Sequence, residues 1–148
     1  MAFHSSLDAL LRVRRGSERQ QKLLLQAAHR QLSAVQSTLD NVDAQINADA
    51  QCELRQMQSG FTAAELHFAE LCRATLRARR QTVAGELAKA RAAREACAQA
   101  FRQAKQQREM LETLRQQQLD AYLQRAARQE QRRLDDLFLL RRAYLSRG

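Results

Sequence analysis

Apolar residues in the first third of the chain recur in a regular heptad pattern. The pattern comprises Leu25, Ala28, Leu32, Val35, Leu39, Val42 and Ile46. Alternating spacings of three and four residues place all of them on one face of a helix, as in a coiled coil. Upstream, Arg14 and Glu18 fall on the same face, so the apolar stripe weakens there. We expect one continuous helix through this region, with a new helix starting at Ser17, after Gly16, as the alternative.

The strongest break in the helical pattern lies within MQSGFTAAELHF, residues 57–68. Gly60 suits the positive φ angle that commonly ends a helix. Thr62 and Glu65 have the spacing of a capping box, which begins a new helix. The stretch therefore predicts a helix–turn–helix corner, with a kinked continuous helix as the alternative.

The sequence predicts an all-α fold in which two long helices form an antiparallel coiled-coil hairpin and the second helix, being longer, overhangs the first. We expect helices at about 5–58 and about 62–146, a corner at 59–62, and a single helical-hairpin domain over 1–148. Residue i should lie opposite residue 120 minus i, within a turn.

The second helix should lack an in-chain partner from about residue 115. Apolar residues continue past that point, at Tyr122, Leu123, Leu134, Leu137, Phe138 and Leu140. An unpaired helix with such residues is expected to bind something else.

Composition supports few, long helices. The 148 residues include no Pro, no Trp and four Gly, and the net charge is +9. Residues 12–30 hold six cations and one anion, and residues 125–148 hold seven cations and three anions. A hairpin brings these two segments towards the same end, which would then be basic and partly apolar. Such an end fits an acidic protein cavity or nucleic acid.

Known catalytic and ligand-binding patterns are missing from the sequence. His4, His29 and His67 are far apart, and no glycine-rich phosphate loop is present. The three cysteines show neither disulfide nor metal-site spacing. We therefore expect no enzyme activity, no cofactor, no metal and no small-molecule substrate. The sequence also predicts neither a signal peptide nor a membrane span, and hence a cytoplasmic protein.

Three segments resemble the FliJ/YscO family, the soluble stalk proteins of flagellar and injectisome type III secretion systems. They are the start with His4, Leu7 and Leu10, the corner at 59–62, and QRRLDDLF at 131–138. The resemblance implies a non-enzymatic stalk and escort component, cytoplasmic and peripheral to the inner membrane at the export apparatus. It does not settle the flagellar or the injectisome branch.

The resemblance also implies partners and their binding residues. The paired basic termini would engage the hexameric export ATPase through Arg12, Arg14, Arg15, Arg19, Arg132, Arg133, Leu137 and Phe138. The cytoplasmic domain of the export-gate membrane protein would bind near the corner, at Val42, Gln45, Cys72 and Leu76. Gln45 and Cys72 stand where the family typically has larger aromatic side chains. Export chaperones would be further partners.

Two other functions remain open from the residues alone. A generic coiled-coil adaptor or scaffold could associate through the overhang. A basic helical protein could associate with nucleic acid, although no groove-reading motif is present.

Overall fold

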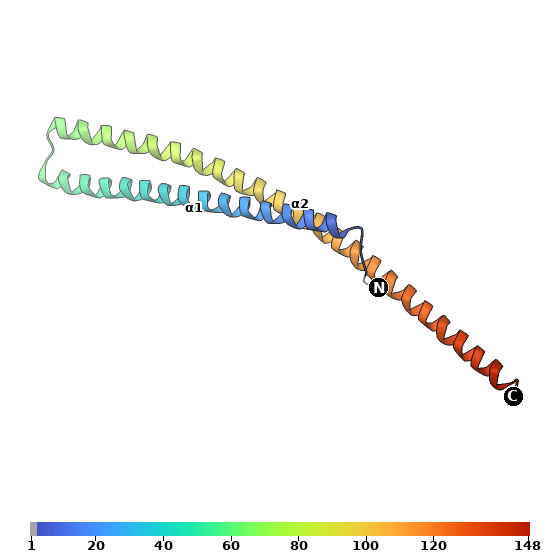
Figure 1. Ribbon diagram of the computed structural model, residues 1–148. Coiled ribbons are helices and arrows are strands. Elements are labelled where there is room, and N and C mark those ends of the chain that lie inside the picture. The colour runs from blue at the N-terminus through green and yellow to red at the C-terminus, as the bar shows by residue number, and fades with distance from the viewer. Residues whose placement is uncertain (1–2) are drawn as a thin grey trace. The chain divides into compact units, whose positions relative to one another are not determined.

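Two α-helices make up nearly all of the computed structural model, which describes residues 3–148 (Figure 1). α1 spans Asp8–Ser59 and α2 spans Ala63–Leu145. The helices pack against each other as a hairpin, which confirms the predicted antiparallel coiled coil. Both run without interruption, so α1 passes through Gly16 as one helix.

The corner forms as its sequence predicts. Gly60 has a φ of 91°, in the left-handed region where a Cβ would be strained. The Thr62 amide donates to Glu65 Oε2 at 3.0 Å, and the Glu65 amide donates to Thr62 Oγ1 at 3.3 Å. This reciprocal capping box satisfies two backbone donors at the start of α2.

A similar cap starts α1 slightly later than the predicted start near residue 5. Ser5 Oγ accepts from the Leu7 amide at 3.1 Å, and the Ser5 amide donates to Asp8 Oδ2 at 3.3 Å. Ser5 is therefore the N-cap residue, outside the helix itself.

Packing divides the chain into two compact units, each described by itself below. The hairpin unit is Gln20–Arg102. The terminal unit comprises Met1–Arg19 and Gln103–Gly148, of which residues 3–19 and 103–148 are described. The single domain expected from sequence stays a prediction.

An apolar cluster holds the two helices of the hairpin unit together. Its members are Val35, Leu39, Val83, Leu87 and Ala90, with Leu32 packed against them. The cluster brings together the predicted partners Leu39 and Val83. Further along α1, Val42 is 1% exposed and is the most buried large side chain of the core. Burial of this stripe is the main favourable contribution to hairpin formation.

The helix register differs from the predicted one by about one turn. Asp43 pairs with Arg80 at 2.6 Å, and Glu53 pairs with Arg73. The residue numbers in these pairs add up to 123 and 126 instead of 120. The Asp43–Arg80 pair lies three residues from the predicted register, within the turn allowed above, whereas the Glu53–Arg73 pair lies six residues from it, beyond that turn.

Shortening Leu87 to alanine should destabilise the hairpin by about 2–4 kcal/mol, because it leaves a cavity in the cluster. Leu134→Ala is the matched control. Leu134 is 54% exposed, so its loss should change stability by less than about 0.5 kcal/mol. Urea unfolding followed by circular dichroism measures both, and equal effects would contradict the packing described here.

Candidate partner-binding surfaces

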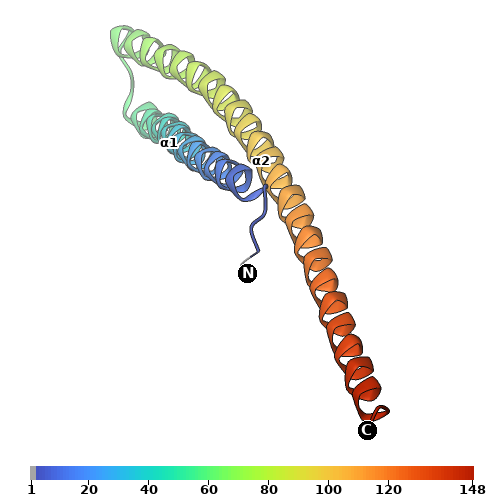
Figure 2. The same cartoon turned by 45° about the vertical axis from the view of Figure 1, so that its right-hand side comes forward.

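The C-terminal segment, defined here as residues 123–148, lies in the terminal unit and is fully exposed. Every residue from 123 onward is exposed, including the part of α2 drawn in red in Figure 2. The last contact described between the chain's N-terminal end and α2 is that of the Phe3 and Tyr122 rings, at 5.4 Å. The large exposed apolar side chains of the segment are Leu123, Leu134, Leu137, Phe138, Leu139, Leu140, Tyr144 and Leu145.

These apolar residues are arranged in two ways along the segment. Leu134, Leu137, Phe138 and Leu145 recur at three- to four-residue steps and multiples of them, which places them on one face of α2. The consecutive residues 137–140, LFLL, point in all directions around the helix axis. A helix that is apolar all round is normally buried on all sides. This part of α2 is therefore suited to a partner that encloses it.

Seven cations against three anions make residues 125–148 basic. Arg132 and Arg133 are exposed and pair with no residue in the described part of the chain. Gln131 donates to Asp135 at 3.3 Å, a contact within the same helix. The segment thus combines exposed apolar area with uncompensated positive charge.

The four arginines of α1 predicted to bind the ATPase fall into two pairs. Arg14 donates to Gln107 Oε1 at 2.7 Å, and Arg15 lies 3.1 Å from Glu112 Oε1. Arg12 and Arg19 are exposed and contact no polar partner among residues 3–148. Two of the four are therefore already used inside the chain.

The structure does not bring the α1 arginines next to those of the C-terminal segment. Arg15 faces Glu112, which lies twenty residues before Arg132 on α2. At 1.5 Å per residue, the two groups are about 30 Å apart along the helix. The eight residues predicted to bind the ATPase therefore form two separate groups in the terminal unit. The four arginines of α1 make one basic patch, and the two arginines of the C-terminal segment make the other, together with the two apolar residues.

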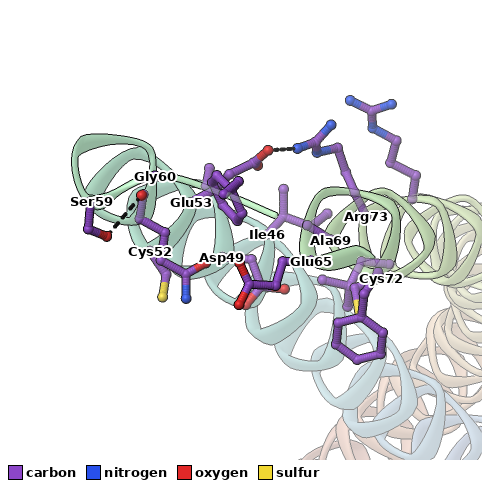
Figure 3. A pocket seen from close by; sticks show the side chains of 16 residues that line it. Ile46, Asp49, Cys52, Glu53, Ser59, Gly60, Glu65, Ala69, Cys72 and Arg73 are labelled. Atoms are coloured by element: carbon purple, nitrogen blue, oxygen red, sulfur yellow. Dashed lines mark hydrogen bonds and ion pairs between the residues drawn. The ribbon is translucent and has the colours of Figure 1, made fainter. Parts of the chain in front are cut away.

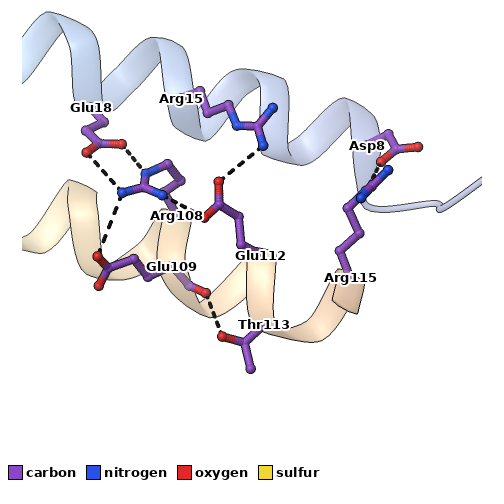
Figure 4. Close-up of polar contacts among 8 residues, drawn as sticks. All are labelled: Asp8, Arg15, Glu18, Arg108, Glu109, Glu112, Thr113 and Arg115. Carbon is purple, nitrogen blue, oxygen red and sulfur yellow. Dashed lines mark hydrogen bonds and ion pairs between the residues drawn. The ribbon is translucent and has the colours of Figure 1, made fainter. Parts of the chain in front are cut away.

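An ionic network in the terminal unit was not predicted from sequence (Figure 4). Arg108 contacts Glu18 of α1, and its Nη1 donates to Glu112 Oε2 at 2.7 Å. The Arg108 side chain is only 20% exposed. The hydrogen bond with the Glu18 carboxylate raises the pKa of Arg108 above its usual value. Glu18 falls on the apolar face of the first helix in the sequence pattern, and a charged residue on that face was the signal that would have predicted a cross-helix ion pair.

A second cross-helix ion pair joins Asp8 to Arg115, with Arg115 Nε 2.6 Å from Asp8 Oδ1. The hydrogen bond from Arg115 lowers the pKa of Asp8, against a smaller opposing effect of desolvation. The Arg115 guanidinium also lies 6.0 Å from the centre of the Phe3 ring. Asp8 thus caps α1 and ties its start to α2.

A cavity of about 620 Å³ lies beside the corner, within the hairpin unit (Figure 3). No residue between 43 and 82 is fully buried, and the cavity is lined by charged side chains such as Asp49 and Glu53 on α1 and by small ones such as Ala69 and Cys72 on α2. Helices that lack interlocking apolar side chains leave space between them. The cavity is lined by apolar and charged groups from both helices.

The four predicted gate-binding residues differ in accessibility. Gln45 is exposed, whereas Cys72 and Leu76 are half-buried and line the cavity. Val42, at 1% exposure, packs in the core and offers no surface while the hairpin is closed. Sequence reasoning missed Phe68, which also lines the cavity and is 69% exposed.

Neither metal-binding nor membrane-spanning features occur in the part of the chain described. No group of three or more His, Cys, Asp or Glu among residues 3–148 could hold a metal ion. Cys52, Cys72 and Cys97 are free thiols. No helix among these residues is both long and apolar enough to cross a bilayer.

The fold defines a two-helix hairpin protein with two exposed, partly apolar surfaces, one beside the corner and one on the C-terminal segment. The family model described as "Flagellar FliJ protein" matches residues 3–148. The chain therefore belongs to the FliJ family, whose members are non-catalytic components of the flagellar type III export apparatus. No curated protein and no solved structure matches it.

Replacing Arg115 with glutamine should raise the pKa of Asp8 towards its ordinary value. Since the folded-state pKa of Asp8 is depressed, its stabilising contribution is present above the unfolded-state pKa and is lost as the pH falls through the folded-state pKa. Carbon-13 NMR titration of the Asp8 carboxyl would measure the change. Arg102→Gln, which removes a contact to Glu95 instead, should leave the Asp8 titration in place. An Asp8 midpoint that does not respond to Arg115→Gln would rule out this pairing.

Proposed function

We propose that this protein is the central stalk and escort of the export apparatus, and that its C-terminal segment engages the hexameric export ATPase. The observation that carries the proposal is the run of exposed apolar residues at 137–140, on a basic helix that no other segment of residues 3–148 covers. The pore of a ring-shaped hexamer would surround an inserted helix on every side. Such a pore would need an apolar band for LFLL and acidic groups for the surrounding arginines.

Within the proposed contact, the roles of the candidate residues differ. Leu137 and Phe138 would supply the buried anchor, since apolar and aromatic side chains dominate interface energetics. Arg132 and Arg133 would act mainly on association rate and orientation. Arg12 and Arg19 would contact a second region of the ATPase, because they belong to the basic patch of α1, which is separate from the basic patch of the C-terminal segment. Arg14 and Arg15 could take part only by leaving their partners on α2.

The corner is proposed to contact the cytoplasmic domain of the export-gate membrane protein. Gln45, Cys72 and Leu76 would form the contact together with Phe68, which projects beside the cavity. Gate binding would place the protein at the inner membrane as a peripheral component. Export chaperones are the third proposed partner. The other large exposed apolar side chains near the corner would offer them a surface, namely Leu54, Met57, Leu66 and Leu71.

A scaffold function is the second candidate, because the exposed apolar stripe of the C-terminal segment could pair with a second copy. A stable dimer that needs Leu137 and Phe138, and that ignores the ATPase, would favour it over the stalk.

The double variant Leu137→Asp, Phe138→Asp should weaken binding to the export ATPase at least about 100-fold, because it puts two charges into the anchor. Circular dichroism should show an unchanged melting temperature, since both residues lie in the part of α2 that does not pair with α1. Leu23→Asp, Leu24→Asp is the matched control, as these neighbours are 58% and 47% exposed on the hairpin unit. Equal binding by both variants would refute the proposed anchor.

Phe68→Asp should reduce binding to the export-gate cytoplasmic domain at least about tenfold while leaving ATPase binding intact. Met110→Asp, at a side chain of similar exposure on the terminal unit, is the control. Calorimetric titration with each purified partner would give both affinities. Loss of ATPase binding in Phe68→Asp, or undiminished gate binding, would contradict the division of labour between the two surfaces.

A further inference from the structure

Different forces hold α1 to α2 in the two units. In the hairpin unit, five apolar side chains are buried together. In the terminal unit, the arm, defined here as residues 3–19, contributes only one buried apolar side chain among its described residues, Leu11 at 2% exposure. The apolar side chains that α2 buries in this unit include the small Ala104, which is buried, and Leu111 and Leu119, which are half-buried. The apolar contribution to arm docking is therefore smaller than that in the hairpin unit.

Charged and polar contacts make up most of the rest of this interface. They join Ser5 to Gln118 at 2.7 Å, Asp8 to Arg115 at 2.6 Å, Arg14 to Gln107 at 2.7 Å, Arg15 to Glu112 at 3.1 Å, and Glu18 to Arg108. The Glu18–Arg108 pair is the most buried of these, whereas the side chains of the other two ion pairs keep between 36% and 61% of their surface exposed.

Exposed ion pairs of this kind contribute about 0–1 kcal/mol each and weaken as salt screens them. Buried apolar contacts have no such dependence. Regions held by few apolar contacts open locally at much lower free energy than the core of the same protein. The arm should therefore open well before the hairpin unit does.

We propose that the arm is a releasable cover for the face of α2 between residues 103 and 122. Release removes Glu18 from Arg108, which keeps Glu112 of its own helix as a partner, and removes Asp8 from Arg115. It also uncovers Leu111 and Leu119, which lie in the same helical stripe and are half-buried in the closed state. That stripe is followed directly by Leu123 of the C-terminal segment. Opening the arm thus lengthens the apolar, basic surface that α2 can offer to a partner, and closing it shortens that surface.

A partner can drive the opening by supplying its own carboxylates to Arg108 and Arg115, the groups that Glu18 and Asp8 now occupy. Release of the arm depends only on contacts within the chain, so it can be tested separately from the proposed export function.

Amide hydrogen exchange on the full-length chain tests the release. Between about 50 mM and about 1 M NaCl, where the screening length falls from roughly 14 Å to 3 Å, exchange in residues 8–19 should speed up at least tenfold. Exchange in residues 32–42 of the hairpin unit should change less than twofold. Arm exchange that is as slow as core exchange and indifferent to salt would overturn the proposal, as would equal acceleration in both units.

A pair of matched variants separates charge pairing in the arm from general electrostatics. Asp8→Asn with Glu18→Gln should accelerate arm exchange at low salt about as much as high salt does. Asp43→Asn with Glu53→Gln removes the same two kinds of Arg-paired carboxylate from the hairpin unit and should leave arm exchange unchanged. Faster arm exchange in the Asp43→Asn, Glu53→Gln variant, with unchanged arm exchange in the Asp8→Asn, Glu18→Gln variant, would refute the proposal that these ion pairs hold the arm.

The distance between the arm and α2 distinguishes release of the arm from local unwinding of an arm that stays docked. Spin labels at the exposed positions Val13 and Met110, in a chain whose three cysteines are serine, report the separation of the arm from α2. High salt should add a longer and broader distance population. A labelled pair at the exposed positions Ala34 and Lys89 should keep a single distance. An unchanged Val13–Met110 distance at high salt would rule out release.

Discussion

Each of the two amphipathic helices can bury its apolar stripe only against the other. A two-helix hairpin has no third layer, so every apolar residue that lacks a cross-helix neighbour stays exposed. The buried cluster around Leu39 and Val83 is where this requirement is best met. Away from it in both directions the contacts change character. Towards the corner the seam becomes acidic or small and a cavity opens, and in the terminal unit ion pairs replace apolar contacts.

Both candidate partner surfaces follow from that constraint. The corner has side chains too small or too polar to close the space between the helices, so apolar groups such as Phe68 remain accessible. The C-terminal segment continues α2 past Tyr122, which contacts Phe3, and its leucines are left exposed by all of the residues that the structure describes. Regions that would be packing defects in a globular protein are therefore the regions of this hairpin that are proposed to bind partners.

Sequence periodicity predicted the helices, the corner and the facing apolar stripes, because heptad spacing and capping-box chemistry are local properties. The exact register could not be predicted, since heptads in both helices allow the pairing to slide by a turn. The contacts of Arg14 and Arg15 could not be predicted from the local sequence either, because they also depend on the helix register. Whether an arginine faces a partner protein or a glutamate on the neighbouring helix depends on the register, and here Gln107 and Glu112 engage both. Burial of Val42 likewise depends on which α2 residues oppose it.

The central claim is that the C-terminal segment acts on the export ATPase. The most direct measurement is the rate of ATP turnover by the purified ATPase hexamer with the full-length chain and with a chain ending at residue 122. The full-length chain should stimulate turnover, whereas the shortened chain should fold with the same melting temperature but give no stimulation. Equal stimulation by both chains would contradict the account, because the segment would then have no part in the contact.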